Sequence, residues 1–115
     1  MRHTQPRELR LYQTPNERVP FAEWYDTIQN LNLQSRIDKR LERVANGNFG
    51  DCRSVGAGIF ELRFHFGAGY RIYFAEVENT IVLLLCAGDK SSQARDIDRA
   101  KEYWSQYKET QQWKN

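Results

Sequence analysis

The sequence predicts an α+β fold on three observations. Apolar residues in the first half of the chain recur at spacings of three and four, which is typical of amphipathic helices. In the second half they alternate or run continuously, as in strands, and helical spacing then returns near the carboxyl end. Helices followed by a run of strands indicate α+β rather than regularly alternating α/β. Residues 1–115 are expected to form one domain, with an ordered core of about residues 8–107.

The first half predicts a strand followed by a helical hairpin. Residues Glu8–Gln13 alternate polar and apolar side chains and indicate an opening strand. Pro20 suits the first position of a helix, and an apolar stripe follows it over Phe21–Leu31. A second stripe over Leu33–Val44 predicts another helix, which Asn46–Gly47 would end. The short link between the two helices favours an antiparallel pair.

The second half predicts three strands joined by tight turns. Ile59–Phe66 alternates, with Phe64 on the apolar face, and a three-residue turn with two glycines follows it. Tyr70–Val77 predicts the next strand. Thr80–Ala87 is almost entirely apolar, as expected for a strand that is covered on both faces.

The last element is expected to be a helix. Ser91 and Ser92 offer an N-cap, and apolar residues over Ile97–Tyr107 follow at helical spacing. The tail from Glu109 is expected to fray. The complete expectation is an amino-terminal strand and a helical hairpin packed on a twisted, mainly antiparallel sheet, with a carboxy-terminal helix.

The turns also predict which residues pair across the sheet. Pairing Phe66 with Tyr70 across the first turn places His65 opposite Arg71, and the second turn then brings Arg71 opposite Cys86. These registers gather four candidate catalytic residues on one face, near one end of the sheet: Arg63, His65, Arg71 and Lys90.

Such a cluster of positive charge has two interpretations. Like charges on neighbouring strands destabilise a sheet by up to about 1 kcal/mol per pair, and a bound phosphodiester would compensate them. Alternatively, Arg63 and Arg71 are exposed sheet residues that pair with acids from other elements. His65 could act as a general acid or base, because imidazole titrates near neutral pH, or it could be a half-exposed strand residue without a chemical role.

A weaker group of side chains could contact RNA. An aromatic residue such as Tyr73 could stack on a base, although strand aromatics more often pack in the core. The basic second helix could contact phosphates, although such a run is more often a solvated helix face. The RNA-binding candidates are Tyr73, Arg53, Arg40 and Arg43.

Composition limits the function classes. Twelve of the 17 basic residues are arginine, which suits bidentate phosphate contacts, but the net charge is only +2. His3 and His65 are the two histidines, so neither a transition-metal site nor a cofactor is expected. Cys52 and Cys86 have no metal-like or redox-like spacing and are expected to be free thiols. With no signal peptide or membrane span in view, we expect a cytoplasmic protein.

Several strings, taken together and in this order, resemble one toxin family. The resemblance covers roughly residues 8–107 and is to the HigB-type addiction module killer branch of the RelE/ParE toxin superfamily. The strings are "PFAEWYDTI" (Pro20–Ile28), "GNFGD" (Gly47–Asp51), "SVGAGIFELR" (Ser54–Arg63), "GAGYRIYF" (Gly67–Phe74), "LLLCAGDKSSQARDI" (Leu83–Ile97) and "RAKEYW" (Arg99–Trp104).

The resemblance implies a RelE-like fold and a toxin that enters the ribosomal A site and cuts messenger RNA there. It implies no metal or cofactor, because the ribose 2′-hydroxyl attacks the adjacent phosphate. It also implies a partner antitoxin with a helix-turn-helix, through which alone the toxin meets DNA. By position, Arg71 matches the phosphate-stabilising arginine of the superfamily, and Arg63 and Lys90 match its other basic residues.

One departure from the family pattern keeps two other functions open. The first turns of the final helix lack the tyrosine that is catalytic in the RelE prototype, and Asp96 and Ile97 stand there instead. A ParE-like inhibitor of DNA gyrase would share the fold without cutting RNA. An inactive relic derived from a prophage is the third reading.

Overall fold

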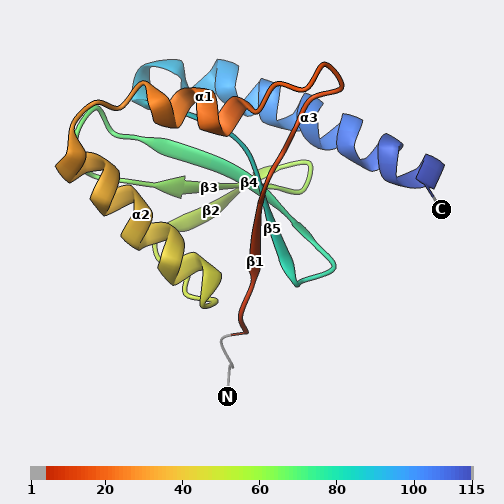
Figure 1. Cartoon of the computed structure of the whole chain (residues 1–115), viewed down its shortest axis with the longest axis horizontal. Helices are drawn as coiled ribbons and strands as arrows, with labels where there is room; N and C mark the ends of the chain where they lie inside the picture. Colours follow the sequence, from red (N-terminus) through yellow and green to blue (C-terminus); the bar gives the residue numbers. More distant parts are fainter. Residues whose placement is uncertain (1–4, 115) are drawn as a thin grey trace.

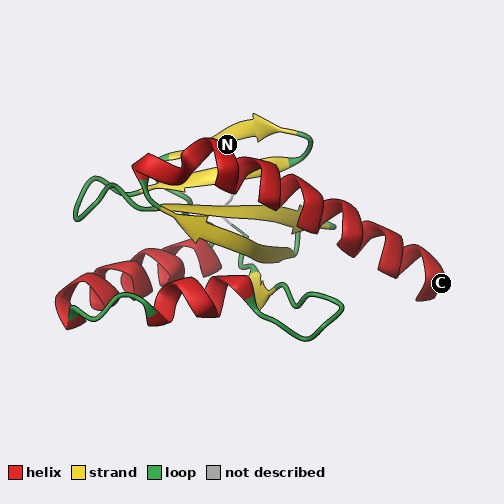
Figure 2. Cartoon of the chain, turned by 90° about the horizontal axis from the view of Figure 1, so that it is seen from above, coloured by secondary structure: helices red, strands yellow, loops and turns green. Residues whose placement is uncertain are grey.

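The chain folds into three layers, with a five-stranded sheet between a helical hairpin and a long carboxy-terminal helix (Figures 1 and 2). This architecture comes from a computed structural model, which describes residues 5–114. The α+β class expected from the sequence is confirmed. The elements in chain order are β1 (Glu8–Leu11), α1 (Pro20–Asp26), α2 (Leu31–Ala45), β2 (Cys52–Gly56), β3 (Ile59–Arg63), β4 (Arg71–Val77), β5 (Ile81–Gly88), the 3-10 turn η1 (Lys90–Ser92) and α3 (Gln93–Lys114).

The sheet has the strand order β1-β5-β4-β3-β2. Strands β2 to β5 are antiparallel neighbours, whereas β1 pairs with β5 in parallel. A parallel neighbour needs a crossover connection, and the polypeptide between β1 and β5 supplies it by way of the hairpin and the other strands. Strand β5 is therefore flanked on both sides, as its continuous apolar sequence predicts.

The helical hairpin is divided differently from the expected stripes. Helix α1 begins at Pro20 and ends at Asp26, and the side chain of Asn30 caps α2 by accepting a hydrogen bond from the Leu33 N–H at 3.1 Å. Ile28 is buried in the connection, but Leu31 begins α2 and is 78% exposed. Extending the first helix to Leu31 is wrong, because the Asn30 cap starts the second helix two residues before its apolar stripe begins.

Each face of the sheet has its own core. On the hairpin side the fully enclosed cluster is Phe21, Ile28, Ile37, Val44, Leu62, Phe64, Ile72, Phe74, Val82 and Leu84. On the α3 side it is Tyr12, Ile59, Tyr73, Ala75, Leu83, Leu85, Cys86 and Ala100. The predicted core position of Phe64 is confirmed. Because Cys52 packs on the first cluster and Cys86 in the second, the two thiols lie on opposite faces and are both free.

One strand, the length of the last helix and its cap differ from what the sequence pattern predicts. Strand β2 is not predicted, because its five residues are polar or small apart from Val55. Helix α3 continues to Lys114, so the expected fraying from Glu109 is wrong. At the start of that segment the cap is the side chain of Asp89, which accepts the Ser91 N–H at 2.8 Å. No helix in the described part of the chain is long and apolar enough to cross a membrane.

Candidate active site

The candidate site lies where β3 ends, β4 begins and β5 ends. Arg63 pairs directly with Arg71, and Arg71 with Gly88. The expected pairings of Arg71 with His65 and with Cys86 are therefore wrong. The first connection is wider than a three-residue turn, because the Phe64 N–H bonds the Tyr70 carbonyl at 3.0 Å. This shift of two residues preserves the face of every side chain, so the predicted cluster still forms.

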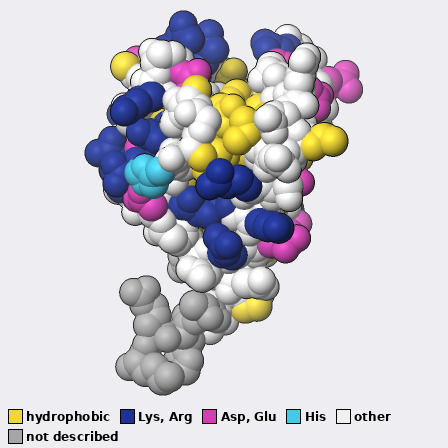
Figure 3. Space-filling model, turned by 90° about the vertical axis from the view of Figure 1, so that its left-hand side faces the viewer, with side chains coloured by type: hydrophobic (Ala, Val, Ile, Leu, Met, Phe, Trp, Pro, Cys, Tyr) yellow, Lys and Arg dark blue, Asp and Glu magenta, His cyan; other side chains and the backbone are white. Residues whose placement is uncertain are grey.

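A hollow of about 390 Å³ opens at this end of the sheet. The backbone N–H of Lys90 bonds the Ala68 carbonyl at 3.4 Å, which ties η1 to the glycine-containing turn. Figure 3 views the molecule from this side and shows Lys and Arg side chains gathered around a histidine. The residues lining the hollow are Phe64, His65, Gly67, Ala68, Gly69, Arg71 and Lys90.

Arg71 carries a buried positive charge at the base of the hollow. Arg71 is only 8% exposed. Its Nη1 donates long hydrogen bonds, of 3.3–3.5 Å, to the carbonyls of Phe64, Gly69 and Tyr70. Its Nε has no hydrogen-bond partner. No carboxylate among residues 5–114 lies within 4 Å of this guanidinium. The alternative that Arg71 is an exposed, acid-paired strand residue is therefore wrong.

Asp51 holds two of the other basic residues of the cluster, Arg63 and His65. Its Oδ1 accepts hydrogen bonds from Arg63 Nη2 at 3.0 Å and Nε at 3.2 Å, and its Oδ2 lies 2.6 Å from Nε2 of His65. These hydrogen bonds, that from His65 first, lower the pKa of Asp51. For Arg63 the acid-paired alternative holds. The sequence pattern does not indicate Asp51, because only the pairing of the unpredicted β2 brings it to β3.

Arg40 positions Asp51 instead of facing solvent. Its Nη1 donates to the Arg63 carbonyl at 2.9 Å, and its Nη2 donates to the carbonyls of Phe49 and Asp51 at 3.1 and 2.8 Å. Burial lowers the pKa of Arg40, yet this guanidinium clamps the start of β2 to the end of β3. Arg40 is thus a partly buried residue that holds the backbone, and its contact with RNA stays a prediction. Arg43 is exposed beside it and stays a candidate.

Tyr73 and Arg53 both bind Glu61. Tyr73 is fully buried, and its hydroxyl donates to Glu61 Oε2 at 3.0 Å. Burial raises the pKa of Tyr73, so the hydroxyl stays protonated. The possible stacking of Tyr73 on a base is excluded, and the alternative of core packing is confirmed. Arg53 forms an ion pair with Glu61 at 2.9 Å but is half exposed, and its contact with RNA stays a prediction.

The arrangement separates two chemical tasks. Arg71 offers a guanidinium without an acidic partner to an anion in the hollow. Asp51 orients the imidazole of His65 through Nε2 and leaves Nδ1 to exchange a proton, the arrangement by which a carboxylate fixes the tautomer of a catalytic histidine. Lys90 is exposed at the rim and adds a third positive charge.

The fold and this hollow define a small α+β protein with basic side chains and a histidine at one end of its sheet. The model of the family described as phage-derived protein Gp49-like (DUF891) matches residues 26–105, which include every residue of the hollow. This chain belongs to that family, which is toxin–antitoxin-like. It is also similar to an uncharacterized protein of Haemophilus influenzae, with 47% identity over 83 residues that cover 72% of this chain and 84% of the relative.

Proposed function

We propose that this protein is the toxin of a toxin–antitoxin pair and that it is a ribosome-dependent endoribonuclease of the HigB type. The observation that supports this most is Arg71, a buried arginine without an acidic partner in the described chain, beside the Asp51–His65 pair. A buried unpaired charge is costly to the fold, and a phosphodiester would supply the missing anion. Inhibition of DNA gyrase would not require this combination of groups.

In the proposed reaction, the 2′-hydroxyl of one nucleotide attacks its own 3′-phosphate. Nδ1 of His65 accepts the hydroxyl proton as the new P–O2′ bond forms. Arg71, with Arg63 beside it, stabilises the charge that builds on the phosphorane-like transition state. The P–O5′ bond then breaks, and the ammonium of Lys90 donates a proton to the leaving oxygen. The products are a 2′,3′-cyclic phosphate and a free 5′-hydroxyl, and no metal or cofactor takes part.

The partners follow from this proposal. The substrate is messenger RNA in the ribosome, and the neutralising partner is a helix-turn-helix antitoxin, which would mediate any contact with DNA. The setting is the cytoplasm.

Primer extension on a reporter transcript tests the activity. After brief induction we expect cuts at a fixed codon phase when translation runs and none when it is blocked. Arg71→Lys keeps the charge but loses the bidentate fork, and should reduce cutting by about 100-fold. The matched control is Arg10→Lys, at an exposed arginine on β1 that pairs with Glu8. We choose lysine and not alanine for this variant because the lysine ammonium can still donate hydrogen bonds to the carbonyls that surround position 71.

Two outcomes would contradict the nuclease. Intact message in growth-arrested cells would instead support gyrase inhibition. Neither growth arrest nor cutting would indicate an inactive relic. Equal cutting by the Arg71→Lys and Arg10→Lys proteins would exclude Arg71 from the reaction.

A further inference from the structure

A second and larger hollow adjoins the candidate active site. It has a volume of about 500 Å³ and runs between the α1–α2 connection and the start of α3. Tyr70 and Asp89 line it, and they directly precede Arg71 and Lys90 of the first hollow. The two hollows therefore have lining residues that are neighbours in sequence, at the start of β4 and at the turn from β5 to η1. We name the larger one the α1–α3 groove.

The α1–α3 groove carries two arginines on α3. Arg95 and Arg99 are exposed, lie one helical turn apart on α3, and have no carboxylate within 4 Å in the part of the chain that the structure describes. Two side chains so spaced share one face of a helix. They can therefore approach one anion together.

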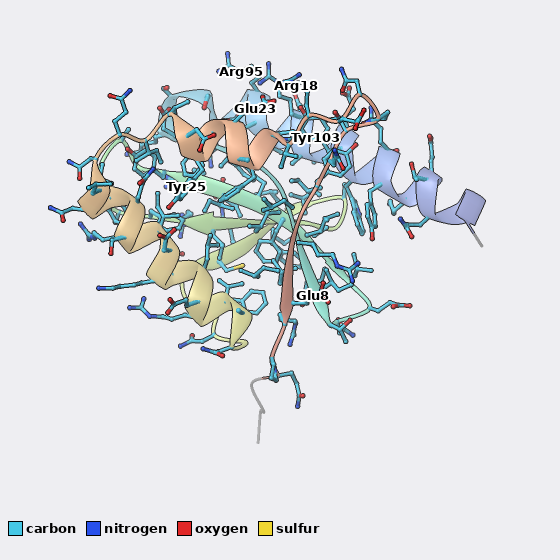
Figure 4. The ribbon with its side chains drawn as sticks, viewed as in Figure 1. Glu8, Arg18, Glu23, Tyr25, Arg95 and Tyr103 are labelled. Atoms are coloured by element: carbon cyan, nitrogen blue, oxygen red, sulfur yellow. The ribbon has the colours of Figure 1, made fainter. Side chains whose placement is uncertain are left out.

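Two carboxylates, Asp89 and Asp96, also line the groove, and serine donors hold both of them. Asp89 accepts hydrogen bonds from the N–H and hydroxyl of Ser91 at 2.8 and 2.5 Å. Asp96 is buried and accepts the Ser92 hydroxyl at 2.5 Å. On α1, Glu23 lies on the same edge of the molecule as Arg95 (Figure 4) but pairs with Arg18 at 2.6 Å. None of these carboxylates forms an ion pair with the two arginines.

The groove also has aromatic and amide side chains. Trp24 and Tyr70 meet edge to face, with ring centroids 5.6 Å apart, and both are partly exposed. Figure 3 shows hydrophobic side chains recessed between two lobes of this side of the molecule. Gln29 and Asn30 are exposed at the rim. Bases of single-stranded RNA stack on aromatic rings, and amides hydrogen-bond their edges.

We infer that the α1–α3 groove binds an unpaired ribonucleotide next to the scissile phosphate, with its base against Trp24 and Tyr70 and its phosphate between Arg95 and Arg99. This inference rests on the proposed function, since the active-site hollow would hold the neighbouring phosphate of the same strand. A protein segment would have to place its own carboxylates at the two arginines while leaving the amides and the aromatic rings without matched partners. RNA satisfies all three kinds of side chain at once.

Binding of an uncleavable RNA tests the groove apart from catalysis. The probe is a fluorescent hexaribonucleotide with 2′-O-methyl groups on every ribose, titrated into the full-length protein and followed by anisotropy. The double variant Arg95→Gln/Arg99→Gln should bind at least about tenfold more weakly. The slope of log affinity against log salt concentration should fall by about the amount that one phosphate contact contributes. The matched control is Lys101→Gln/Lys108→Gln, which removes two charges from the same helix and should change binding less than about twofold.

Tryptophan emission provides the second readout. RNA should quench emission from the wild type and from Trp104→Phe, whose ring stacks on Tyr107 outside the groove, but not from Trp24→Phe. Quenching that persists in Trp24→Phe, or equal losses of affinity in the two double variants, would overturn the inference. So would the absence of RNA binding by the wild type, or a loss of antitoxin binding in the arginine variant with RNA binding unchanged.

The outcomes separate this inference from the proposed nuclease. Cutting of translated message together with unchanged RNA binding by Arg95→Gln/Arg99→Gln would reject the groove and keep the nuclease. Uncut message together with weakened RNA binding by that variant would reject the nuclease and keep the groove as an RNA site.

Discussion

At the scale of single residues, Glu61 shows how the fold tolerates a fully buried carboxylate. Its oxygens accept hydrogen bonds from Gln93 at 2.7 Å, Arg53 at 2.9 Å and Tyr73 at 3.0 Å. Burial alone would raise the pKa of Glu61, but the three donors outweigh that effect and hold the pKa below its usual value. Residues from three strands and one helix thus meet at one charge.

Replacing Glu61 by glutamine tests this network through pH. A depressed carboxylate pKa means that the stabilisation is present above the pKa of the unfolded chain and is lost as the pH falls through the folded value. At pH 7, Glu61→Gln should lower the free energy of unfolding by about 1–3 kcal/mol, because donors are left with a poorer acceptor. Urea titrations at pH 7 and at about pH 3 should give a smaller difference at the lower pH.

Tyr73→Phe is the control for that experiment. It removes one hydrogen bond, which is expected to be worth about 0.5–1.5 kcal/mol, and leaves the carboxylate in place. Its unfolding free energy should therefore keep a pH dependence of the same sign but smaller size, because Gln93 and Arg53 still donate to Glu61. A Glu61→Gln effect of the same size at both pH values would show that the carboxylate is not ionised in the native protein at neutral pH.

At the scale of elements, the junction of β5 with α3 is the tightest contact near the site. The end of β5 is Gly88, and a Cβ there would collide with the carboxylate of Asp96 and the hydroxyl of Ser92. Those two side chains are hydrogen-bonded to each other, and they belong to the end of η1 and the first turn of α3. The missing side chain of Gly88 therefore sets how closely α3 approaches the sheet, and with it the position of Lys90.

Gly88→Ala should move the start of α3 away from β5. We expect a loss of about 1–3 kcal/mol in unfolding free energy, the usual cost of overpacking a rigid contact. The double variant Gly88→Ala/Asp96→Ala should lose less than the sum of its single changes, because the obstructing carboxylate is gone. Additive losses in this double-mutant cycle, measured by urea unfolding, would show that the collision is relieved elsewhere.

At the scale of the whole molecule, one sheet joins two cores. Neighbouring residues of β5 alternate between them, with Val82 and Leu84 on the hairpin side and Leu83 and Leu85 on the α3 side. Because the same strands line both clusters, the loss of one core removes the support of the other. The three layers are expected to unfold together.

Truncation of one residue in each core tests this coupling. Phe64→Ala on the hairpin side should cost about 3–5 kcal/mol and Leu85→Ala on the α3 side about 2–5 kcal/mol. Both variants should keep a single unfolding transition with an unchanged denaturant slope, seen alike by circular dichroism and tryptophan emission. Two separate transitions in either variant, or an unchanged midpoint for Phe64→Ala, would contradict a shared core.

Sequence periodicity by itself determined the fold class, most elements and the face on which each strand residue lies. These properties depend on local backbone geometry, since side chains alternate in a strand and recur every three to four residues in a helix. The gathering of Arg63, His65, Arg71 and Lys90 was predictable for the same reason, because a two-residue change in register leaves every side chain on its face. Ordered strings in the sequence likewise indicated a toxin–antitoxin-like family, which is the coarser part of the expected resemblance.

Tertiary structure alone decided what those side chains do. The sequence pattern contains no signal for β2, so it could not show that Asp51 holds Arg63 and His65 or that Arg40 clamps that loop. Burial and charge pairing depend on which elements pack together, which is a property of contacts distant in sequence. For the same physical reason, only the packed structure distinguishes Arg71, buried without an acid among the described residues, from an ordinary exposed arginine.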